Sequence, residues 1–118
     1  MTEFALVLPL LALLLFGVIQ FGIVFHHYVT LTDAVRAGAR QAAVSRSESN
    51  PEDVVEDRVR GSAASLDQTD LDVDVDADSG WVQGEDVTVT ATYPYDISLL
   101  GIVVKSGDLT SSTTERIE

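Results

Sequence analysis

Hydrophobic and polar residues divide the chain into two segments of different character. The 22 residues from Phe4 to Phe25 read FALVLPLLALLLFGVIQFGIVF, in which Gln20 has the one polar side chain and no residue is charged. A membrane-spanning helix needs about 20 apolar residues, and this segment reaches ~33 Å at a rise of 1.5 Å per residue. A small soluble domain cannot bury a cylinder that is apolar on all sides, so either lipid or a bundle of identical helices must surround it.

A cleaved secretory signal is the main alternative for this segment. Signals have shorter apolar regions, a basic start and a small-residue cleavage site, whereas here Met1-Thr2-Glu3 precedes the segment and His26-His27-Tyr28 follows it. We therefore expect the segment to be retained. The positive-inside rule places the C-terminal part in the cytoplasm, because the first arginines follow the segment. A basic leader before Met1, later removed, would make the rule inapplicable, and we favour that alternative.

The helical pattern continues beyond the apolar segment. Apolar and small residues recur at helical spacing at Val24, Leu31, Val35, Gly38 and Ala42. The pattern predicts one helix from about Thr2 to Ser45, which Pro9 should bend or locally break. Its alanines and Gly38 would let a sheet or another helix approach closely.

A second, shorter helix is predicted at about 51–64. Asn50 precedes Pro51 and two acidic residues, which is typical of a helix N-terminus with an Asn cap and proline in the first position. Val55, Val59 and Ala63 share one face, and Leu66 follows. Gly61 weakens the helix near its end.

Three strands are predicted after this helix, at about 70–78, 85–93 and 109–117. The first two alternate strictly between apolar and polar residues, and turn residues separate them. We expect residues 96–107 to form a partly buried loop. The fold class is therefore α+β: a long N-terminal apolar helix, a short helix and a three-stranded antiparallel sheet packed on residues 26–45. Residues 1–25 would form a transmembrane or filament-core helix, and 26–118 an acidic globular domain.

Charge excludes some functions. The net charge is −12 and the pI about 4.2, so nucleic acid is not an expected partner, since phosphate binding requires clustered Lys and Arg. Fourteen of the 19 acidic residues lie between Glu48 and Asp96. Such a surface repels itself and suits a secreted domain in high salt. Without cysteine, no disulfide or zinc-thiolate site can form.

The acidic strand contains a partial calcium-loop pattern. Asp74, Asp76 and Asp78 have the spacing of the first three ligands, and Glu85 stands at position 12. Ser79 occupies the position that requires glycine, and no helix pair flanks the pattern. A solvated strand face is therefore the favoured interpretation, and no metal site is expected.

Other candidate positions lie in or beside the apolar segment. His26, His27 and Tyr28 fit an interfacial belt better than a metal site. Gly17 and Gly22 are five apart, unlike the G-x-x-x-G spacing, and would permit close helix contact in a core. Gln20 could hydrogen-bond across helices. No catalytic motif or phosphate-binding loop is present, so neither enzymatic activity nor a cofactor is expected.

Five stretches of the chain resemble one family. They are Thr2–Leu10 (TEFALVLPL), Phe16–Gly22 (FGVIQFG), Ala34–Arg40 (AVRAGAR), Val87–Tyr95 (VTVTATYPY) and the closing Glu115–Glu118 (ERIE). Together they resemble the TadE-like proteins of tight-adherence pilus systems. The N-terminal match covers about 40 residues and is quite specific, whereas the C-terminal match is looser.

The resemblance implies a pilin or minor pilin whose N-terminal helix sits in the membrane before assembly and in the filament core afterwards. It also implies a short basic leader removed by a prepilin peptidase, and an early Glu that compensates the N-terminal amine of a neighbouring subunit. Glu3 matches that Glu, although pilins usually place it fifth. Met1 is then a first mature residue, a start codon or a truncation point, and these alternatives stay open.

Glu3 also has a simpler interpretation. A carboxylate at a helix N-terminus gains ~0.3–1 kcal/mol from the helix dipole without any role in assembly.

From the resemblance, the expected function is a structural subunit of an extracellular filament, with other pilin subunits and the assembly machinery as partners. Two alternatives are a single-span membrane-anchored assembly factor that stays out of the shaft, and a secreted adhesion module.

Overall fold

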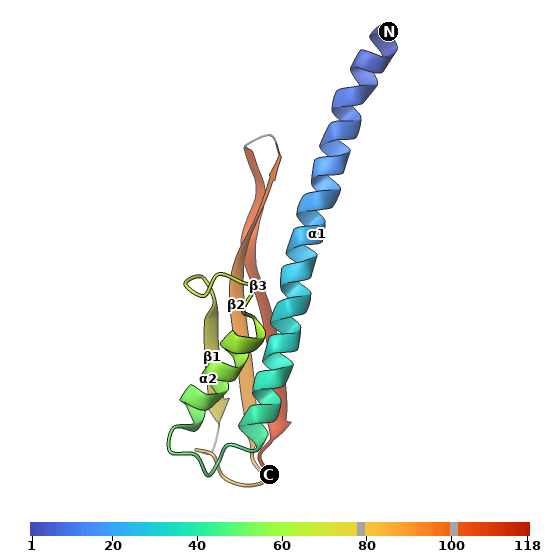
Figure 1. The fold of residues 1–118 in the computed structure, drawn as a ribbon. Helices are drawn as coiled ribbons and strands as arrows, with labels where there is room; N and C mark the ends of the chain where they lie inside the picture. Colours follow the sequence, from blue (N-terminus) through green and yellow to red (C-terminus); the bar gives the residue numbers. More distant parts are fainter. Residues whose placement is uncertain (78–79, 100–101) are drawn as a thin grey trace.

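The computed structural model describes residues 1–77, 80–99 and 102–118. Two helices precede three strands: α1 (Thr2–Ala43), α2 (Pro51–Ser62), β1 (Asp72–Ala77), β2 (Asp86–Leu99) and β3 (Ile102–Arg116). The strands form one antiparallel sheet in the order β1-β2-β3. The predicted α+β class, with a long apolar helix, a short helix and a three-stranded antiparallel sheet, is confirmed. The molecule is elongated, 71 × 22 × 19 Å, and its termini lie at opposite ends (Figure 1).

The long helix α1 runs without interruption through Pro9. The local break considered at this position is therefore wrong. Proline removes one backbone donor, and the hydrogen bonds of the neighbouring turns keep the helix continuous. The helix ends at Ala43, where turn bonds from Val44 N–H to the Gln41 carbonyl and from Ser45 N–H to the Ala42 carbonyl replace helical ones.

The short helix α2 lies beside the lower half of α1 (Figure 1). Asn50 occupies the N-cap position as expected, but its side chain makes no capping hydrogen bond. Pro51 and two acids still fit the first turn, because proline needs no donor there and carboxylates favour the positive end of the helix dipole. An ion pair from Arg60 Nε to Glu56 Oε1 at 3.0 Å, four residues apart, bridges the last two turns.

The strands β2 and β3 form a long hairpin, which is the main departure from the predicted elements. Residues expected to form a partly buried loop, 96–107, instead belong to strands as far as Leu99 and from Ile102 onward. The pairing continues through Tyr95↔Gly107 and Ile97↔Lys105, with an irregularity between Ile97 and Ser98. β-branched residues such as Ile97 and Val103 favour the extended strand conformation. Val103 is 57% exposed, so burial of its side chain does not account for the pairing.

Glycine and aromatic residues support the upper hairpin. A Cβ atom on Gly107 would lie 3.2 Å from the ring and hydroxyl of Tyr95, its cross-strand partner. The Tyr95 ring therefore covers the backbone of Gly107, an arrangement that stabilises a glycine in a strand. Gly107 interrupts the alternation of apolar and polar residues in the sequence, but β3 continues through it.

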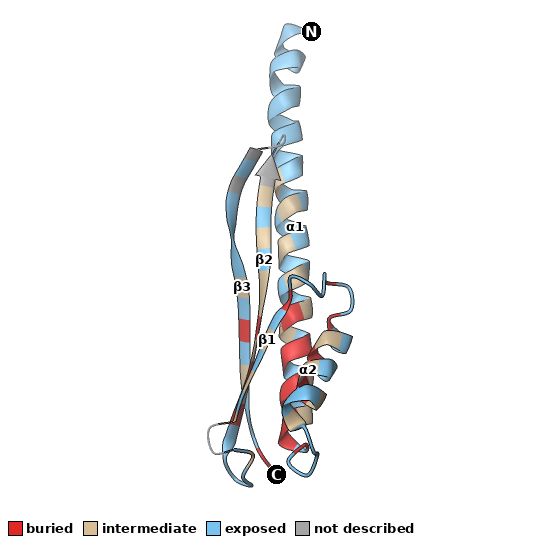
Figure 2. Cartoon of the chain, turned by 90° about the vertical axis from the view of Figure 1, so that its left-hand side faces the viewer, coloured by how far each residue is buried: buried red, intermediate tan, exposed pale blue. Residues whose placement is uncertain are grey.

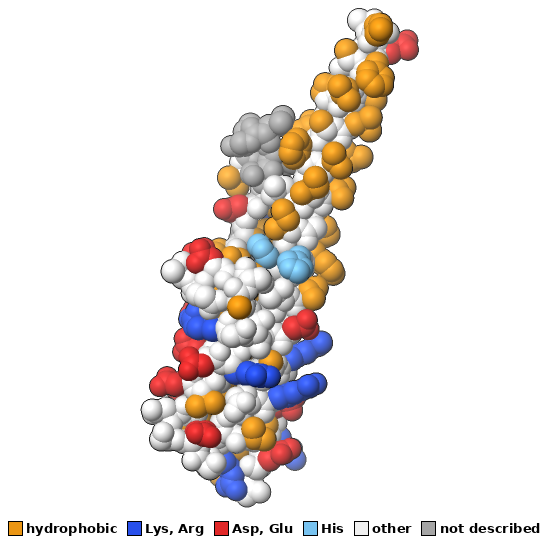
Figure 3. Space-filling view, viewed as in Figure 1, with side chains coloured by type: hydrophobic (Ala, Val, Ile, Leu, Met, Phe, Trp, Pro, Cys, Tyr) orange, Lys and Arg blue, Asp and Glu red, His pale blue; other side chains and the backbone are white. Residues whose placement is uncertain are grey.

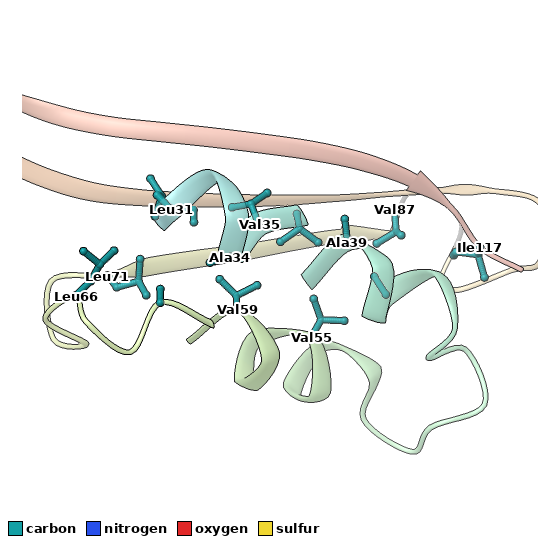
Figure 4. Packing of buried hydrophobic residues seen from close by; sticks show 14 residues of the cluster. Leu31, Ala34, Val35, Ala39, Val55, Val59, Leu66, Leu71, Val87 and Ile117 are labelled. Carbon is teal, nitrogen blue, oxygen red and sulfur yellow. The ribbon is translucent and has the colours of Figure 1, made fainter. Parts of the chain in front are cut away.

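The core lies between the lower half of α1, α2 and the sheet (Figure 4). All of its α1 members lie at Leu31 or beyond, whereas the N-terminal half of the helix is mostly exposed (Figure 2). The helical face predicted from the sequence thus enters the core from Leu31 onward, whereas Val24, which the spacing places on the same face, lies outside the core and is half-buried. The fully buried or nearly buried members of the core are Leu31, Ala34, Val35, Ala39, Ala42, Val55, Val59, Ala63, Leu66, Leu71, Val87, Val89, Ala91 and Ile117.

The C-terminus closes the base of the molecule. Ile117 is 1% exposed. Its N–H donates to the Glu85 carbonyl and its carbonyl accepts from Gly84 N–H, both at 2.8 Å. Glu118 N–H donates to the Ala43 carbonyl at 2.9 Å. Gly84 has φ of +88°, a conformation that favours glycine. The last two residues thereby connect the sheet to the end of α1.

Candidate functional site

The most prominent candidate site is the apolar surface on the N-terminal half of α1. Hydrophobic side chains cover this part of the helix on the face shown in Figure 3, and most charged side chains lie over the lower half of the molecule. Large apolar residues are exposed along it, including Phe4 at 69%, Leu6 at 78% and Phe21 at 65%. Exposure of this extent in contiguous apolar residues is typical of a surface that binds lipid or other protein chains.

The helix α1 is long and apolar enough to cross a membrane, by length and composition, and its most apolar window of 18 residues has no buried member. The core helix of a soluble protein would be mostly buried, which this window is not. Membrane anchoring therefore fits the N-terminal apolar helix.

The polar and small residues singled out in this segment have different environments. Glu3 lies in the first turn of α1 and is exposed, and Pro9 is exposed as well. Gly17 and Gln20 are half-buried and Gly22 is exposed. A Cβ atom on Gly17 or Gly22 would meet no atom within 4 Å, so packing within one chain requires glycine at neither position.

The β2–β3 hairpin lies alongside part of the apolar surface (Figure 2). The rings of His27 and Tyr93 contact each other edge to face, with centroids 5.4 Å apart. Above this contact, half-buried positions recur on α1 at Val24, Gln20 and Gly17, at helical spacing. The hairpin therefore partly covers one side of the apolar segment between residues 17 and 24, whereas residues 4–16 are exposed. The sequence pattern did not reveal this partial cover, because it places no strand beside residues 17–24.

The acidic strand offers separated carboxylates. Asp72, Asp74 and Asp76 are exposed on one face of β1, opposite Thr92, Thr90 and Thr88 of β2. Asp78 and Ser79 of the calcium-loop pattern lie outside the described residues. Within the residues that the structure describes, no three His, Asp or Glu side chains form a group that could hold a metal ion.

Two shallow hollows lie elsewhere on the described surface. One is lined by the start of α2 (Asn50, Pro51, Glu52, Asp53) and by Trp81, whose φ of 70° is unusual for a residue with a side chain. The other lies on α1, lined by Phe25, Tyr28, Val29, Thr32, Asp33 and Arg36. Neither brings together a nucleophile and a base in the manner that covalent catalysis requires.

The start of the chain matches a family model. Residues 1–40 match the model described as TadE-like protein. The resemblance to the TadE-like family is thereby confirmed. No match to this chain was found among curated proteins or among solved structures.

The TadE-like match covers the segment that carries the exposed apolar surface. It begins at Met1 and ends four turns of helix beyond His26, so it includes the whole apolar segment and the first core positions of α1. The family is pilus-related and structural, which supports involvement in a tight-adherence pilus and a location at the cell surface.

Proposed function

We propose that this chain is a pilin or minor pilin of an extracellular tight-adherence-type pilus and polymerises through the N-terminal half of α1. The observation that carries the proposal is the exposed apolar surface from Phe4 to Phe25, in a segment that matches the TadE-like model. Residues 1–25 form the filament-core or transmembrane part in this proposal, and residues 26–118 form the acidic head.

Two environments would cover this surface in turn. Before assembly the segment lies in the membrane as a single span, and after assembly it lies against the equivalent helices of neighbouring copies. Lipid tails are as apolar as leucine, so transfer from lipid to the filament core gains little from the hydrophobic effect. The free energy of assembly must then come from close packing, from polar contacts and from an energy-consuming assembly machine.

Small residues in the segment would serve this packing. Gly17 and Gly22 leave open space where a side chain would stand, and none of the described residues fills it. Backbones of neighbouring helices could approach closely there, as small residues permit in membrane helices. Gln20 would supply a hydrogen bond between helices, and Pro9 would adjust the packing near the N-terminus.

Glu3 would fix the axial position of each copy. Its carboxylate is exposed in the free chain, and burial in an apolar core is costly unless a cation faces it. The resemblance suggests the N-terminal amine of a neighbour as that cation, after a prepilin peptidase has removed a leader. A helix cap without a role in assembly is the competing explanation.

The decisive experiment compares sheared extracellular fibres with detergent-extracted membranes. A filament subunit is expected in the fibres, whereas a membrane-anchored assembly factor stays with the membranes. Mass spectrometry of the mature N-terminus separates both from a secreted adhesion module, which would lack the residues before about His27. Recovery in the membrane fraction alone would contradict the pilin proposal in favour of the assembly factor.

Substitution of Glu3 tests its role. Glu3→Ala and Glu3→Gln are expected to lower recovery in fibres, since each removes the carboxylate that positions the helix. Glu48→Ala, which removes an exposed carboxylate from the loop before α2, is the matched control and should leave recovery unchanged. If Glu3→Ala is recovered in fibres at the wild-type yield, Glu3 has no role in assembly and serves only as a helix cap.

A further inference from the structure

We infer that Lys105, on the upper part of the β2–β3 hairpin, binds the Glu3 carboxylate of a neighbouring copy and sets the axial shift between subunits. The inference rests on the proposed function, because the two residues can face each other in an assembly but not within one chain. It assigns to Glu3 a partner that is fixed in the fold.

The level of Lys105 along α1 follows from two contacts. The His27–Tyr93 ring contact places Tyr93 beside the end of the apolar segment. Ile97 lies four residues further along β2, ~14 Å at the rise of an extended strand, and it pairs with Lys105. A distance of ~14 Å corresponds to about nine helical residues. Lys105 therefore lies near the level of Val18, well within the apolar segment.

No other basic residue of the chain lies at that level. Lys105 is the one lysine in the sequence. The six arginines belong to the lower part of α1, the following loop, α2 and the end of β3: they are Arg36, Arg40, Arg46, Arg58, Arg60 and Arg116. Lys105 is thus the one side-chain cation placed to meet a charge in a core built from residues 4–25.

The acidic side of the pair is equally well defined. Glu3 is the first acidic residue of the chain, and the next is Asp33, 30 positions later. Both Glu3 and Lys105 are exposed. Among the described residues, the ion pair formed within the chain joins Arg60 and Glu56, and neither Glu3 nor Lys105 takes part in one.

The two charges are separated along α1 by a fixed distance. From Glu3 to the level of Val18 is 15 residues, or ~22 Å at the helical rise. The two groups cannot meet in one chain, because α1 is a continuous helix. A neighbouring copy shifted by about 22 Å along the axis brings its Glu3 to the level of Lys105.

The chemistry of the pair suits a dry interface. Exclusion of water strengthens the attraction between carboxylate and ammonium, and it also makes an unpaired Glu3 costly. The lysine stem can lie along apolar neighbours such as Val103 and extend its ammonium to the carboxylate. The N-terminal amine of a neighbour lies at the start of α1, in the filament core, whereas Lys105 belongs to the head. A Glu3–Lys105 pair would therefore link the filament core to the layer formed by the heads.

Cysteine cross-linking tests the contact directly, because the native chain has no cysteine. A chain that carries both Glu3→Cys and Lys105→Cys has lost both charges, so fewer fibres are expected. After oxidation, the fibres that do form should give a ladder of disulfide-linked multimers on a non-reducing gel. The matched control combines Glu3→Cys with Arg116→Cys, at the opposite end of β3, and should form no ladder. Fibres of the first double variant without a ladder would overturn the inference.

A charge exchange tests the energetics. Lys105→Glu is expected to lower fibre recovery at least about tenfold, the smallest effect expected from disrupting a buried charge pair. The combination of Glu3→Lys with Lys105→Glu should restore it, and Lys105→Arg should keep it. Circular dichroism of each variant confirms that the fold is intact.

The outcomes separate the inference from the proposed function. Wild-type yields from Lys105→Glu would overturn the pair while the chain remains a filament subunit. A loss of membrane-bound protein before assembly, without rescue by the charge exchange, would assign Lys105 to anionic lipid headgroups and would also overturn it. Absence of the wild-type chain from fibres would remove both the proposed function and the pair.

Discussion

Gly38 is a residue of α1 that packs tightly against α2. A Cβ atom there would overlap Val59 Cγ2, and Val59 is fully buried and cannot move aside freely. Overpacking of this kind costs ~1–3 kcal/mol, while alanine gains about 1 kcal/mol over glycine in a helix. We therefore expect Gly38→Ala to lower the free energy of unfolding by up to about 2 kcal/mol, measured by denaturant titration in detergent.

Gly61 provides the matched control for this prediction. It lies in α2, and a Cβ atom there would meet nothing within 4 Å. Gly61→Ala should raise the free energy of unfolding by ~0.5–1 kcal/mol, because only the helix propensity changes. Equal effects of the two substitutions would contradict the close packing of α1 against Val59.

Asp67 makes a local pair of hydrogen bonds in the turn before β1. Its Oδ1 accepts from the Thr69 hydroxyl at 2.7 Å and from the Thr69 backbone N–H at 3.0 Å. These bonds, the side-chain bond first, favour the charged form and hold the pKa of Asp67 below its ordinary value. The stabilisation is present above the ordinary pKa and is lost as the pH falls through the lowered one.

The prediction for this turn is a shift in titration. Thr69→Val removes the hydroxyl and keeps the backbone N–H, so the pKa of Asp67 should rise toward its ordinary value, observed by NMR titration of the carboxyl carbon. An unchanged pKa of Asp67 would show that the hydroxyl bond does not form in solution.

Residues in periodic positions were predictable, and isolated ones were not. Leu31, Val35, Val55 and Val59 could be assigned to the core because helical spacing alone places them on one face. Lys105 and Trp81 belong to no repeating pattern. Their environments depend on segments distant in sequence, which local spacing does not specify.

At the scale of elements, the β2–β3 hairpin shows why the strand ends were missed. Strict alternation stops near Tyr95, so residues 96–107 resemble a loop in the sequence. The hairpin continues because each residue pairs with one already aligned on the opposite strand, and Tyr95 covers Gly107. Antiparallel register extends pairing beyond the residues whose own propensity would start a strand.

The outer face of the sheet combines acidic side chains on β1 with hydroxyl groups on β2 and β3. Asp72, Asp74 and Asp76 face threonines of β2. Further across the sheet, Thr88 bonds to Thr114 at 2.9 Å, and Thr90 to Ser112 at 2.8 Å. The carboxylates stand two residues apart, ~7 Å, with no cation opposite them, so they repel one another.

Salt should relieve this repulsion. We expect the unfolding midpoint to rise by about 4 °C in about 1 M NaCl, where the Debye length falls to ~3 Å. A variant with Asp72→Asn, Asp74→Asn and Asp76→Asn should show a smaller rise, and circular dichroism measures both midpoints. A full salt effect in that variant would place the responsible charges elsewhere.

At the scale of the whole molecule, the apolar segment and the core are separable. Every α1 residue of the core lies at Leu31 or later, so the segment from Phe4 to Phe25 contributes no member to it. A chain without residues 1–25 should lose the helical signal of those residues, keep a cooperative thermal unfolding transition, and remain in the aqueous phase of a detergent partition. The full chain should enter the detergent phase, because most of its apolar segment is exposed to water in the free chain.

The outcome of that partition bears on the whole interpretation. A full chain that stays monomeric in the aqueous phase would contradict both the membrane and the filament proposals. The sequence alone was sufficient to predict this surface, since 22 consecutive residues without charge are unambiguous. It could not predict that the hairpin covers part of it, which depends on pairing between distant segments.

The continuity of α1 has a mechanical consequence. Helix and head share one hydrogen-bonded rod from Thr2 to Ala43, without a hinge between them. A pull on the N-terminal end travels along the rod to Ala43, where the Glu118 N–H bond and the surrounding core pass it to the sheet. The force then acts nearly parallel to the strands, so many contacts between paired strands bear it at the same time. A filament of such subunits would stretch little before a head unfolds.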